Sequence, residues 1–328
     1  MMRTRLSHEA HRHRGAPYLA SLLFVVTLVL AGCNPGTAEA KRLRGACNAG
    51  EAAACNQFAI KLQKGEHVLR DQPHAAELFD QACRGGVGDG CASLAVMLQR
   101  GSGVDRDSAR AVDLLTRGCE RGGLDGCARL GVLYRKGAGV AHDDARAASL
   151  FQKGCDGGAM TGCADLGALY AAGEGVARNY ARAAELFRKS CDSTVTDGCA
   201  GLGRLYASGT GVAQSDSTAA ALFKQACDAR DATGCFYLAT VYETGRGMPQ
   251  NFERAATLYR RSCRARDGEA CARLAVMYER GTGVRRRPEE AAALRKRACD
   301  VGYAEACVDP KAANPKTSNS QTSNPRAS

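Results

Sequence analysis

Residues 127–163 read CARLGVLYRKGAGVAHDDARAASLFQKGCDGGAMTGC and contain one complete copy of a unit that recurs along the chain. Cys127 and Cys163 are 36 residues apart, and Cys155 stands eight residues before Cys163. The same spacing holds along the chain without an insertion, giving the pairs Cys47 and Cys55, Cys83 and Cys91, Cys119 and Cys127, Cys155 and Cys163, Cys191 and Cys199, Cys227 and Cys235, Cys263 and Cys271, and Cys299 and Cys307. A strict period of this length is typical of a solenoid, in which each unit packs on its neighbours.

The first half of each unit predicts a helix, called helix A. In the copy quoted above, Leu130, Leu133 and Tyr134 share one helical face. Gly137 ends this helix, since glycine readily adopts the left-handed conformation found after a helix C-terminus. A small residue follows the first leucine, which indicates close helix crossings, at Ala95, Gly131, Gly167, Gly203, Ala239 and Ala275.

The second half predicts an antiparallel helix, called helix B. Short polar side chains that can cap a helix N-terminus stand at its start, at Asp71, Asp107, Asp143, Asn179, Ser215 and Asn251. The helix then ends at the first cysteine of the next pair. Neither helix can bury its apolar face alone. The expected fold is therefore all-α: an α/α solenoid (superhelix) of about seven 36-residue helix pairs over residues 47–307.

The N-terminal residues predict an export signal. Four arginines precede an apolar run over residues 18–30, which is too short for a permanent membrane helix but suits a signal peptide. The run ends in Leu30-Ala31-Gly32-Cys33, which resembles the bacterial lipobox. That resemblance implies a lipoprotein signal peptide over residues 1–32 and lipid attachment at Cys33. A plain signal peptide is the alternative.

The remaining segments are short. We expect residues 33–46 to form the lipidated anchor, a tether over residues 34–40 and a partial capping helix whose last turns begin at Lys41. The tail over residues 308–328 is rich in Pro, Lys, Asn, Ser and Thr and predicts disorder. The net charge is +11, which is consistent with a soluble surface that is ordinarily enriched in Lys and Arg; attraction of anionic partners is the alternative interpretation. Nucleic acid is not expected, because no basic block is interleaved with aromatic residues.

The repeated unit resembles a known family. Residues 130–134, LGVLY, and residues 137–140, GAGV, are similar to the Sel-one-like (Sel1-like) repeat, a relative of the tetratricopeptide repeat. The cysteine pairs resemble those of the Helicobacter cysteine-rich protein family of secreted solenoids, and the resemblance covers every unit. It implies a solenoid without a cofactor. It also brings an alternative activity, because that family has been associated with penicillin binding and weak β-lactam hydrolysis.

The sixteen cysteines of the repeats are expected to form eight local disulfides. The spacing of eight places one cysteine at the end of helix B and its partner at the start of the next helix A, within disulfide range. Each bridge would stabilise the fold by about 2–3 kcal/mol, and export supplies an oxidising compartment. Zinc is the rival interpretation, but no Cys-x-x-Cys pair exists and only His67, His74 and His142 follow the signal.

Candidate binding residues are those that differ from copy to copy in one helix A position. The position holds Gln57, Ser93, Arg129, Asp165, Gly201, Tyr237 and Arg273. Its variety indicates a solvent-facing or groove-facing site, and Arg129, Tyr237 and Arg273 are the candidates. Phe236, Tyr237 and Tyr242 are candidates for an aromatic spot that binds a peptide or glycan. Ordinary surface variation is the alternative interpretation. A second column, expected to pack in the core, contains Tyr134, Tyr170, Tyr206, Tyr242 and Tyr278.

No catalytic residue is assigned. Beyond the signal, the chain contains no Ser-x-x-Lys, Ser-Asp-Asn or Lys-Thr-Gly motif of serine β-lactamases. We expect a monomeric lipoprotein of the bacterial cell envelope, on the outer membrane facing the periplasm, that binds a protein, a peptide or peptidoglycan. A β-lactam hydrolase or penicillin-binding protein is the alternative by resemblance, and a purely structural envelope lipoprotein is the third hypothesis.

Overall fold

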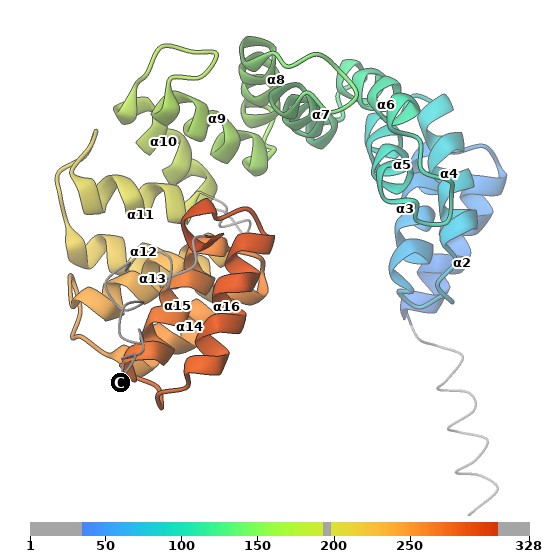
Figure 1. Cartoon of the computed structure of the whole chain (residues 1–328). Coiled ribbons are helices and arrows are strands. Elements are labelled where there is room, and N and C mark those ends of the chain that lie inside the picture. Colours follow the sequence, from blue (N-terminus) through green and yellow to red (C-terminus); the bar gives the residue numbers. More distant parts are fainter. Residues whose placement is uncertain (1–34, 193–197, 308–328) are drawn as a thin grey trace, which may run out of the picture. The chain divides into compact units, whose positions relative to one another are not determined.

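The computed structural model describes residues 35–192 and 198–307, and within them the chain is helical (Figure 1). The signal peptide, Cys33 and the tail over residues 308–328 lie outside the described residues. The helices are α2 (Pro35–Asn48), α3 (Ala52–Lys64), α4 (Gln72–Arg84), α5 (Gly88–Arg100), α6 (Ser108–Glu120), α7 (Leu124–Lys136), α8 (Asp144–Asp156), α9 (Met160–Ala172), α10 (Tyr180–Cys191), α11 (Cys199–Ser208), α12 (Asp216–Asp228), α13 (Ala232–Thr244), α14 (Phe252–Arg264), α15 (Gly268–Arg280), α16 (Pro288–Asp300) and the short 3-10 helix η1 (Ala304–Cys307).

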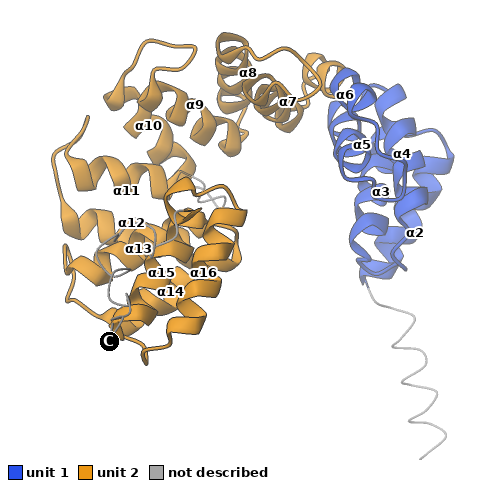
Figure 2. Cartoon of the chain, in the orientation of Figure 1, with its two compact units in different colours: residues 1–114 blue, residues 115–328 orange. Residues whose placement is uncertain are grey.

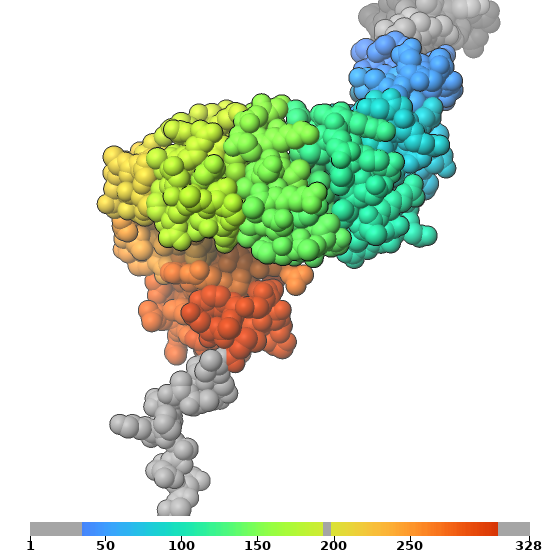
Figure 3. Space-filling model, turned by 90° about the horizontal axis from the view of Figure 1, so that it is seen from above, coloured from blue at the N-terminus to red at the C-terminus, as the bar shows by residue number. Residues whose placement is uncertain are grey.

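The helices alternate as expected, with odd-numbered α3 to α15 as helices A and even-numbered α4 to α16 as helices B. This gives seven helix pairs and confirms the all-α solenoid class. The chain divides into two compact units, residues 1–114 and residues 115–328 (Figure 2). In the second unit, successive repeats follow one another as adjacent layers in chain order (Figure 3).

Helix boundaries follow the capping residues. Asp71 accepts a hydrogen bond from the backbone N–H of His74 at 3.1 Å, and Asn251 does the same for Arg254 at 2.9 Å. These caps satisfy N–H groups that the first helical turn leaves without a partner. The last helix B differs, because Arg287 makes no side-chain cap and Pro288 starts the helix instead. Proline suits that position, since it has no N–H to satisfy.

One position of each helix B faces the space behind its helix A, and in six of the seven repeats its side chain is buried there. These residues, called the ring column, are Phe79, Leu115, Phe151, Phe187, Phe223, Tyr259 and, in the last repeat, Arg295. The small helix A residues make room for the rings: a Cβ at Gly131 would lie 2.7 Å from the Phe151 ring, and one at Gly203 would lie 2.6 Å from the Phe223 ring. The interpretation of these positions as close crossings is therefore correct.

A second set of glycines joins successive repeats. These residues, called the glycine seam, lie in the A–B turns and contact the first turn of the preceding helix B. Gly211 has a φ of +76°, and a Cβ there would lie 2.5 Å from the carbonyl carbon of Tyr180, at the start of α10. Both the backbone conformation and the close approach require glycine. The seam comprises Gly103, Gly175, Gly211, Gly247 and Gly283.

All eight cysteine pairs are disulfide-bonded, with Cα–Cα distances from 4.4 to 4.8 Å. Each bond joins the end of one helix B to the next helix A, or to η1 in the last case. Fourteen of the cysteines are at most 4% exposed. The exception is the last bond, in which Cys299 is half-buried and Cys307 exposed.

Long polar side chains also link consecutive helices B. Lys153 and Lys189 donate hydrogen bonds from Nζ to the carbonyl oxygens of Cys119 and Cys155, at 3.1 and 3.0 Å. Gln225 makes the same contact one repeat further on, at 3.2 Å. The three donors, called the junction clamps, lie two residues before the first cysteine of a pair. They bind the negative C-terminal end of the preceding helix B.

The expected tether is wrong for residues 35–40, because α2 starts at Pro35 and not at Lys41. Ala40 is 3% and Leu43 2% exposed, so the helix has its own apolar stripe. Glu39 pairs with Lys61 of α3 at 3.0 Å. The residues taken as a tether are therefore the first turns of a complete capping helix. None of the described helices is sufficiently long and apolar to cross a bilayer.

Candidate functional site

The free face of helices A in the second unit is the candidate binding surface. Successive helices A contact one another there, α7 with α9, α9 with α11 and α11 with α13, whereas successive helices B lie farther apart. In a curved stack of helix pairs, the layer whose helices lie closer together is on the inner side. Helices A therefore form the inner layer. We define the inner face as the helix A residues two and five positions after the helix cysteine, such as Arg129 and Val132 in α7.

The inner face includes the variable position noted in the sequence. None of its seven residues is buried: Gln57 and Arg129 are exposed, and the other five are half-buried. This agrees with a solvent-facing position. Arg129 makes none of the hydrogen bonds or ion pairs found among the described residues, so its charge is free to meet an anionic group.

Tyr237 lies in an aromatic cluster on α13. Its ring stacks on Phe223 with the centroids 5.1 Å apart, and the guanidinium of Arg204 lies 5.5 Å from its centroid. The three aromatic residues considered as one binding spot do not lie together on the surface, however. Phe236 is only 8% exposed and packs on Tyr259, because it takes a core position of helix A. Tyr242 lines a different groove.

That groove is about 420 Å³ and has Leu238 and Leu258 among its lining residues. Tyr242 is held there by Arg254, whose guanidinium donates to its hydroxyl at 3.1 Å. The tyrosine column as a whole is less buried than expected. Tyr278 is 9% exposed, but the other four tyrosines are half-buried at the edge of the core clusters. The polar hydroxyl explains this position, since it stays within reach of water or a partner.

Arg273 belongs to a network of paired charges. It donates to Glu269 at 2.9 Å and to Glu243 at 3.5 Å. Glu243 in turn accepts a 2.6 Å hydrogen bond from the hydroxyl of Tyr259. Burial, assisted by this carboxylate, raises the pKa of Tyr259 above its ordinary value, so the hydroxyl remains a donor. The charge of Arg273 is thus balanced within the protein, unlike that of Arg129.

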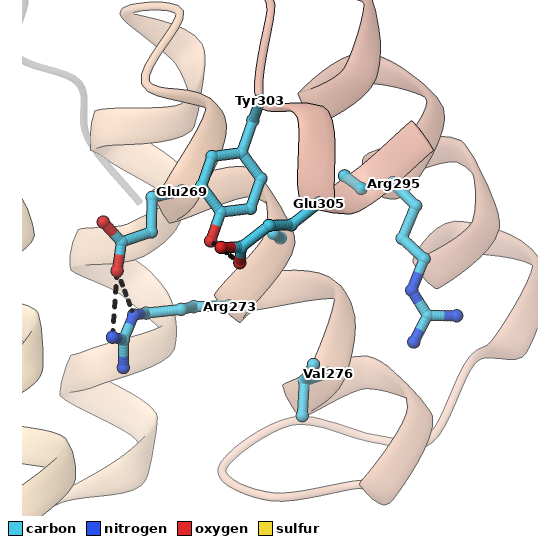
Figure 4. Close-up of a pocket in the computed structure, with 8 residues that line it drawn as sticks. Glu269, Arg273, Val276, Arg295, Tyr303 and Glu305 are labelled. Carbon is cyan, nitrogen blue, oxygen red and sulfur yellow. Dashed lines mark hydrogen bonds and ion pairs between the residues drawn. The ribbon is translucent and has the colours of Figure 1, made fainter. Parts of the chain in front are cut away.

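A cleft opens beside Arg273 at the end of the solenoid (Figure 4). Its volume is about 290 Å³. Three elements contribute to this terminal cleft, which is lined by Glu269, Ala272, Arg273 and Val276 of α15, by Arg295 of α16, and by Tyr303, Glu305 and Ala306 at η1. The hydroxyl of Tyr303 donates to Glu305 at 2.6 Å, and this carboxylate raises the pKa of Tyr303 to about 12.

A family model of the Sel1 repeat matches seven consecutive segments of the chain, residues 52–87, 88–123, 124–158, 161–194, 196–231, 232–267 and 268–303. The chain belongs to the Sel1 repeat family. Each matched segment contains one helix A and the helix B that follows it, which confirms the resemblance noted in the sequence. Sel1 repeats typically mediate protein–protein interactions, and the family is generally a non-enzymatic scaffold.

Solved Sel1 repeat structures resemble this chain. A protective antigen of uropathogenic Escherichia coli strains displaying an SLR fold is 26% identical, with a TM-score of 0.60; the match covers 81% of this chain and 57% of that one. The chain thus spans little more than half the length of that antigen. A Sel1 repeat protein from Oxalobacter formigenes is 21% identical, with a TM-score of 0.64, over 74% of this chain and 96% of that one.

Cysteine-rich protein B of Helicobacter pylori is also among the similar structures. It is 30% identical over 40% of this chain and 93% of that one, with a TM-score of 0.33. A comparison with curated proteins finds no match. Among the residues that the structure describes in this Sel1 repeat protein, no cluster of three or more His, Cys, Asp or Glu side chains could hold a metal ion.

Sequence reasoning missed the terminal cleft and the junction clamps. The cleft has a signal in the sequence, because Arg295 is the one charged residue of the ring column, whose other members are large and hydrophobic. The clamps have one as well, since a long polar residue stands two positions before the first cysteine of every pair from Cys83 onward. The Sel1 repeat alone does not reveal either feature.

Proposed function

We propose that this Sel1 repeat protein is an adaptor of the bacterial cell envelope that holds a partner polypeptide along its inner face. One observation carries the proposal: the core positions of helix A keep their character from repeat to repeat, whereas the inner-face position two residues after the helix cysteine changes at every step. Arg129, Asp165 and Tyr237 occupy equivalent places in the helices A α7, α9 and α13. Gly201, at the same place in α11, is set by packing instead, because a Cβ there would lie 2.7 Å from the Phe187 ring. Folding alone does not demand such variety, but recognition of an irregular partner does.

The N-terminal sequence supports the envelope location. In this proposal, residues 1–32 direct export and are removed, and Cys33 carries the lipid that anchors the protein as a monomer. Asn34 follows the anchor, where an aspartate would favour the inner membrane, so we place the protein on the outer membrane facing the periplasm. An oxidising compartment also suits a chain with eight disulfides.

β-Lactam hydrolysis has no supporting observation among the described residues. The Ser215 hydroxyl caps α12 through the N–H of Thr218, and the Ser262 hydroxyl bonds Asp267 at a repeat junction at 2.8 Å. Both hydroxyl groups thus have structural partners within the fold. A peptidoglycan ligand likewise rests on no specific contact, so a polypeptide remains the proposed partner.

Site-specific photo-crosslinking in the producing cells tests the adaptor role. A benzoylphenylalanine at Val132, on the inner face, should form crosslinks to a discrete partner. The matched control places the same residue at Glu185, an exposed position of helix α10, where crosslinks should be at least tenfold fewer. Equal crosslinking at both positions, or none at Val132, would contradict the proposal.

A further inference from the structure

The ring column fills the space beside helix A in six repeats and fails to fill it in the seventh. Its first six members are Phe79, Leu115, Phe151, Phe187, Phe223 and Tyr259, and each is at most 7% exposed. The seventh, Arg295, is 27% exposed and pairs with Glu279 through both guanidinium NH2 groups. In the seventh repeat, a charged side chain thus stands where the others have a hydrophobic one, and Glu279 holds its guanidinium group.

A second position borders the same space, and it holds an alanine in most repeats, such as Ala128 and Ala200, but a phenylalanine in the sixth. In that repeat, Phe236 and Tyr259 pack together with their ring centroids 5.8 Å apart. The residues at these places in the last repeat are Ala272 and Arg295. Both line the terminal cleft, so its hollow of about 290 Å³ occupies the position of two rings in the repeat before it. The Phe236–Tyr259 pair therefore serves as a template, which indicates that aromatic rings fit in this space.

We propose that the terminal cleft binds an aromatic side chain of a partner polypeptide. The inference rests on the adaptor function proposed above and names the chemistry of one contact. In the template, the guanidinium of Arg273 lies 5.7 Å from the centroid of the Phe236 ring. In the terminal cleft, the guanidinium of Arg295 has the equivalent role toward an incoming ring, since arginine planes stack well on aromatic faces.

The walls of the cleft favour a neutral ring over an anionic group. Ala272, Val276 and Ala306 contribute apolar surface, and Tyr303 contributes a ring edge or face. Both arginines are already paired, Arg273 with Glu269 and Arg295 with Glu279, and Glu305 accepts the hydroxyl of Tyr303. An anionic ligand would have to displace a carboxylate from one of these arginines. A neutral ring would bury apolar surface and leave both ion pairs in place.

The cleft is placed to act with the inner face. Arg273 and Val276 line the cleft and are also the inner-face residues of α15. Figure 4 shows the Arg273 side chain and Tyr303 on the same side of the opening. A polypeptide that follows the inner face therefore reaches the cleft at its end, where one aromatic residue anchors it. Interfaces often concentrate binding energy in such buried aromatic anchors.

Fluorine NMR with N-acetyl-4-fluorophenylalanine amide as the probe tests the proposal on the full mature chain. The wild type should shift and broaden the fluorine signal. Arg295→Phe restores the ring column and should weaken probe binding at least tenfold while raising the melting temperature. Lys296→Phe adds the same residue at an exposed position of the same helix and should leave binding unchanged. Ala272→Phe fills the cleft from α15 and should weaken probe binding as well. It replaces Arg295→Phe in the test if that variant does not fold.

The outcomes separate this inference from the adaptor role. Undiminished probe binding by folded Arg295→Phe and Ala272→Phe, or no binding by the wild type, would overturn the cleft proposal even if crosslinking from Val132 persists. Equal competition by N-acetylleucine amide would also overturn it, since the site would then not select a ring. Loss of Val132 crosslinks alone, with probe binding intact, would instead contradict the adaptor function.

Discussion

Lys189 donates a hydrogen bond from its Nζ to the carbonyl oxygen of Cys155, 34 residues earlier, at 3.0 Å. The acceptor lies at the C-terminal end of α8, where it also accepts a hydrogen bond from the backbone N–H of Gly158 at 3.1 Å. A cation at that end is favoured by the helix dipole. The contact therefore ties α10 to α8, independently of the covalent bond.

Replacing this donor should weaken the junction. Lys189→Met keeps the length of the side chain but removes the charged donor to the carbonyl of Cys155, which keeps only its backbone donor, Gly158 N–H; the free energy of unfolding should fall by about 1 kcal/mol. Lys224→Met is the control, because Lys224 pairs with Asp228 on an exposed surface and should change stability by about 0.5 kcal/mol or less. Urea unfolding of the oxidised protein compares them, and equal midpoints would contradict the clamp.

The glycine seam predicts a contrast between two alanine substitutions. Gly122 has a φ of +82° with open space around its Cβ position, so Gly122→Ala should cost about 1 kcal/mol through backbone strain alone. Gly211→Ala adds a clash with Tyr180 to similar strain and should cost about 2 kcal/mol or more. Thermal unfolding measures both. Equal losses would mean that the seam does not hold successive repeats together.

The exposed disulfide should be reduced first. The Cys299–Cys307 disulfide joins α16 to η1, and Cys307 is exposed. The cysteines of the other seven bonds are at most 4% exposed. Attack by a thiolate requires access to the sulfur. Mild dithiothreitol without denaturant, followed by alkylation and mass spectrometry, should label Cys299 and Cys307 before any other pair. Simultaneous labelling of Cys155 and Cys163 would refute this order.

Tyr303 should titrate at high pH. Its hydrogen bond to Glu305 raises its pKa to about 12, above the ordinary value of 10.0, because the phenolate would face a carboxylate. The resulting stabilisation of the folded state is fully present below the unfolded pKa and is lost as the pH rises through the folded pKa. Ultraviolet titration should show Glu305→Gln lowering the pKa of Tyr303, while Glu289→Gln, on an exposed part of α16, should leave it unchanged.

Much of the fold follows from local sequence signals. The 36-residue period, the caps such as Asp143 and the left-handed Gly137 each reflect a contact within one repeat or between neighbours, so a periodic pattern predicts them. The start of α2 was misjudged because Pro35 and Gly36 are typical of loops. Proline is equally suited to the first turn of a helix, and packing of Leu43 favours the helical state.

Less of the candidate site could be predicted from the sequence. The variable inner-face position can be recognised because it breaks the repeat, and Arg129 is exposed as that reasoning requires. Whether a side chain is free or paired depends on neighbours from other helices. Arg273 pairs with Glu269 of its own helix, which a spacing of four allows, but its second partner, Glu243, approaches from α13; Phe236 is buried because Tyr259 packs on it. Such contacts between repeats are set by packing, and a single copy of the unit does not encode them.

The most direct test of the account is non-reducing peptide mapping by mass spectrometry of protein isolated from the envelope of its own host. The account predicts eight linked peptides, each joining a cysteine to the one eight residues later, and a lipid-modified mature N-terminus at Cys33. Free thiols at Cys83 and Cys91 and at the equivalent pairs, with an unprocessed N-terminus, would contradict an exported, disulfide-stabilised solenoid.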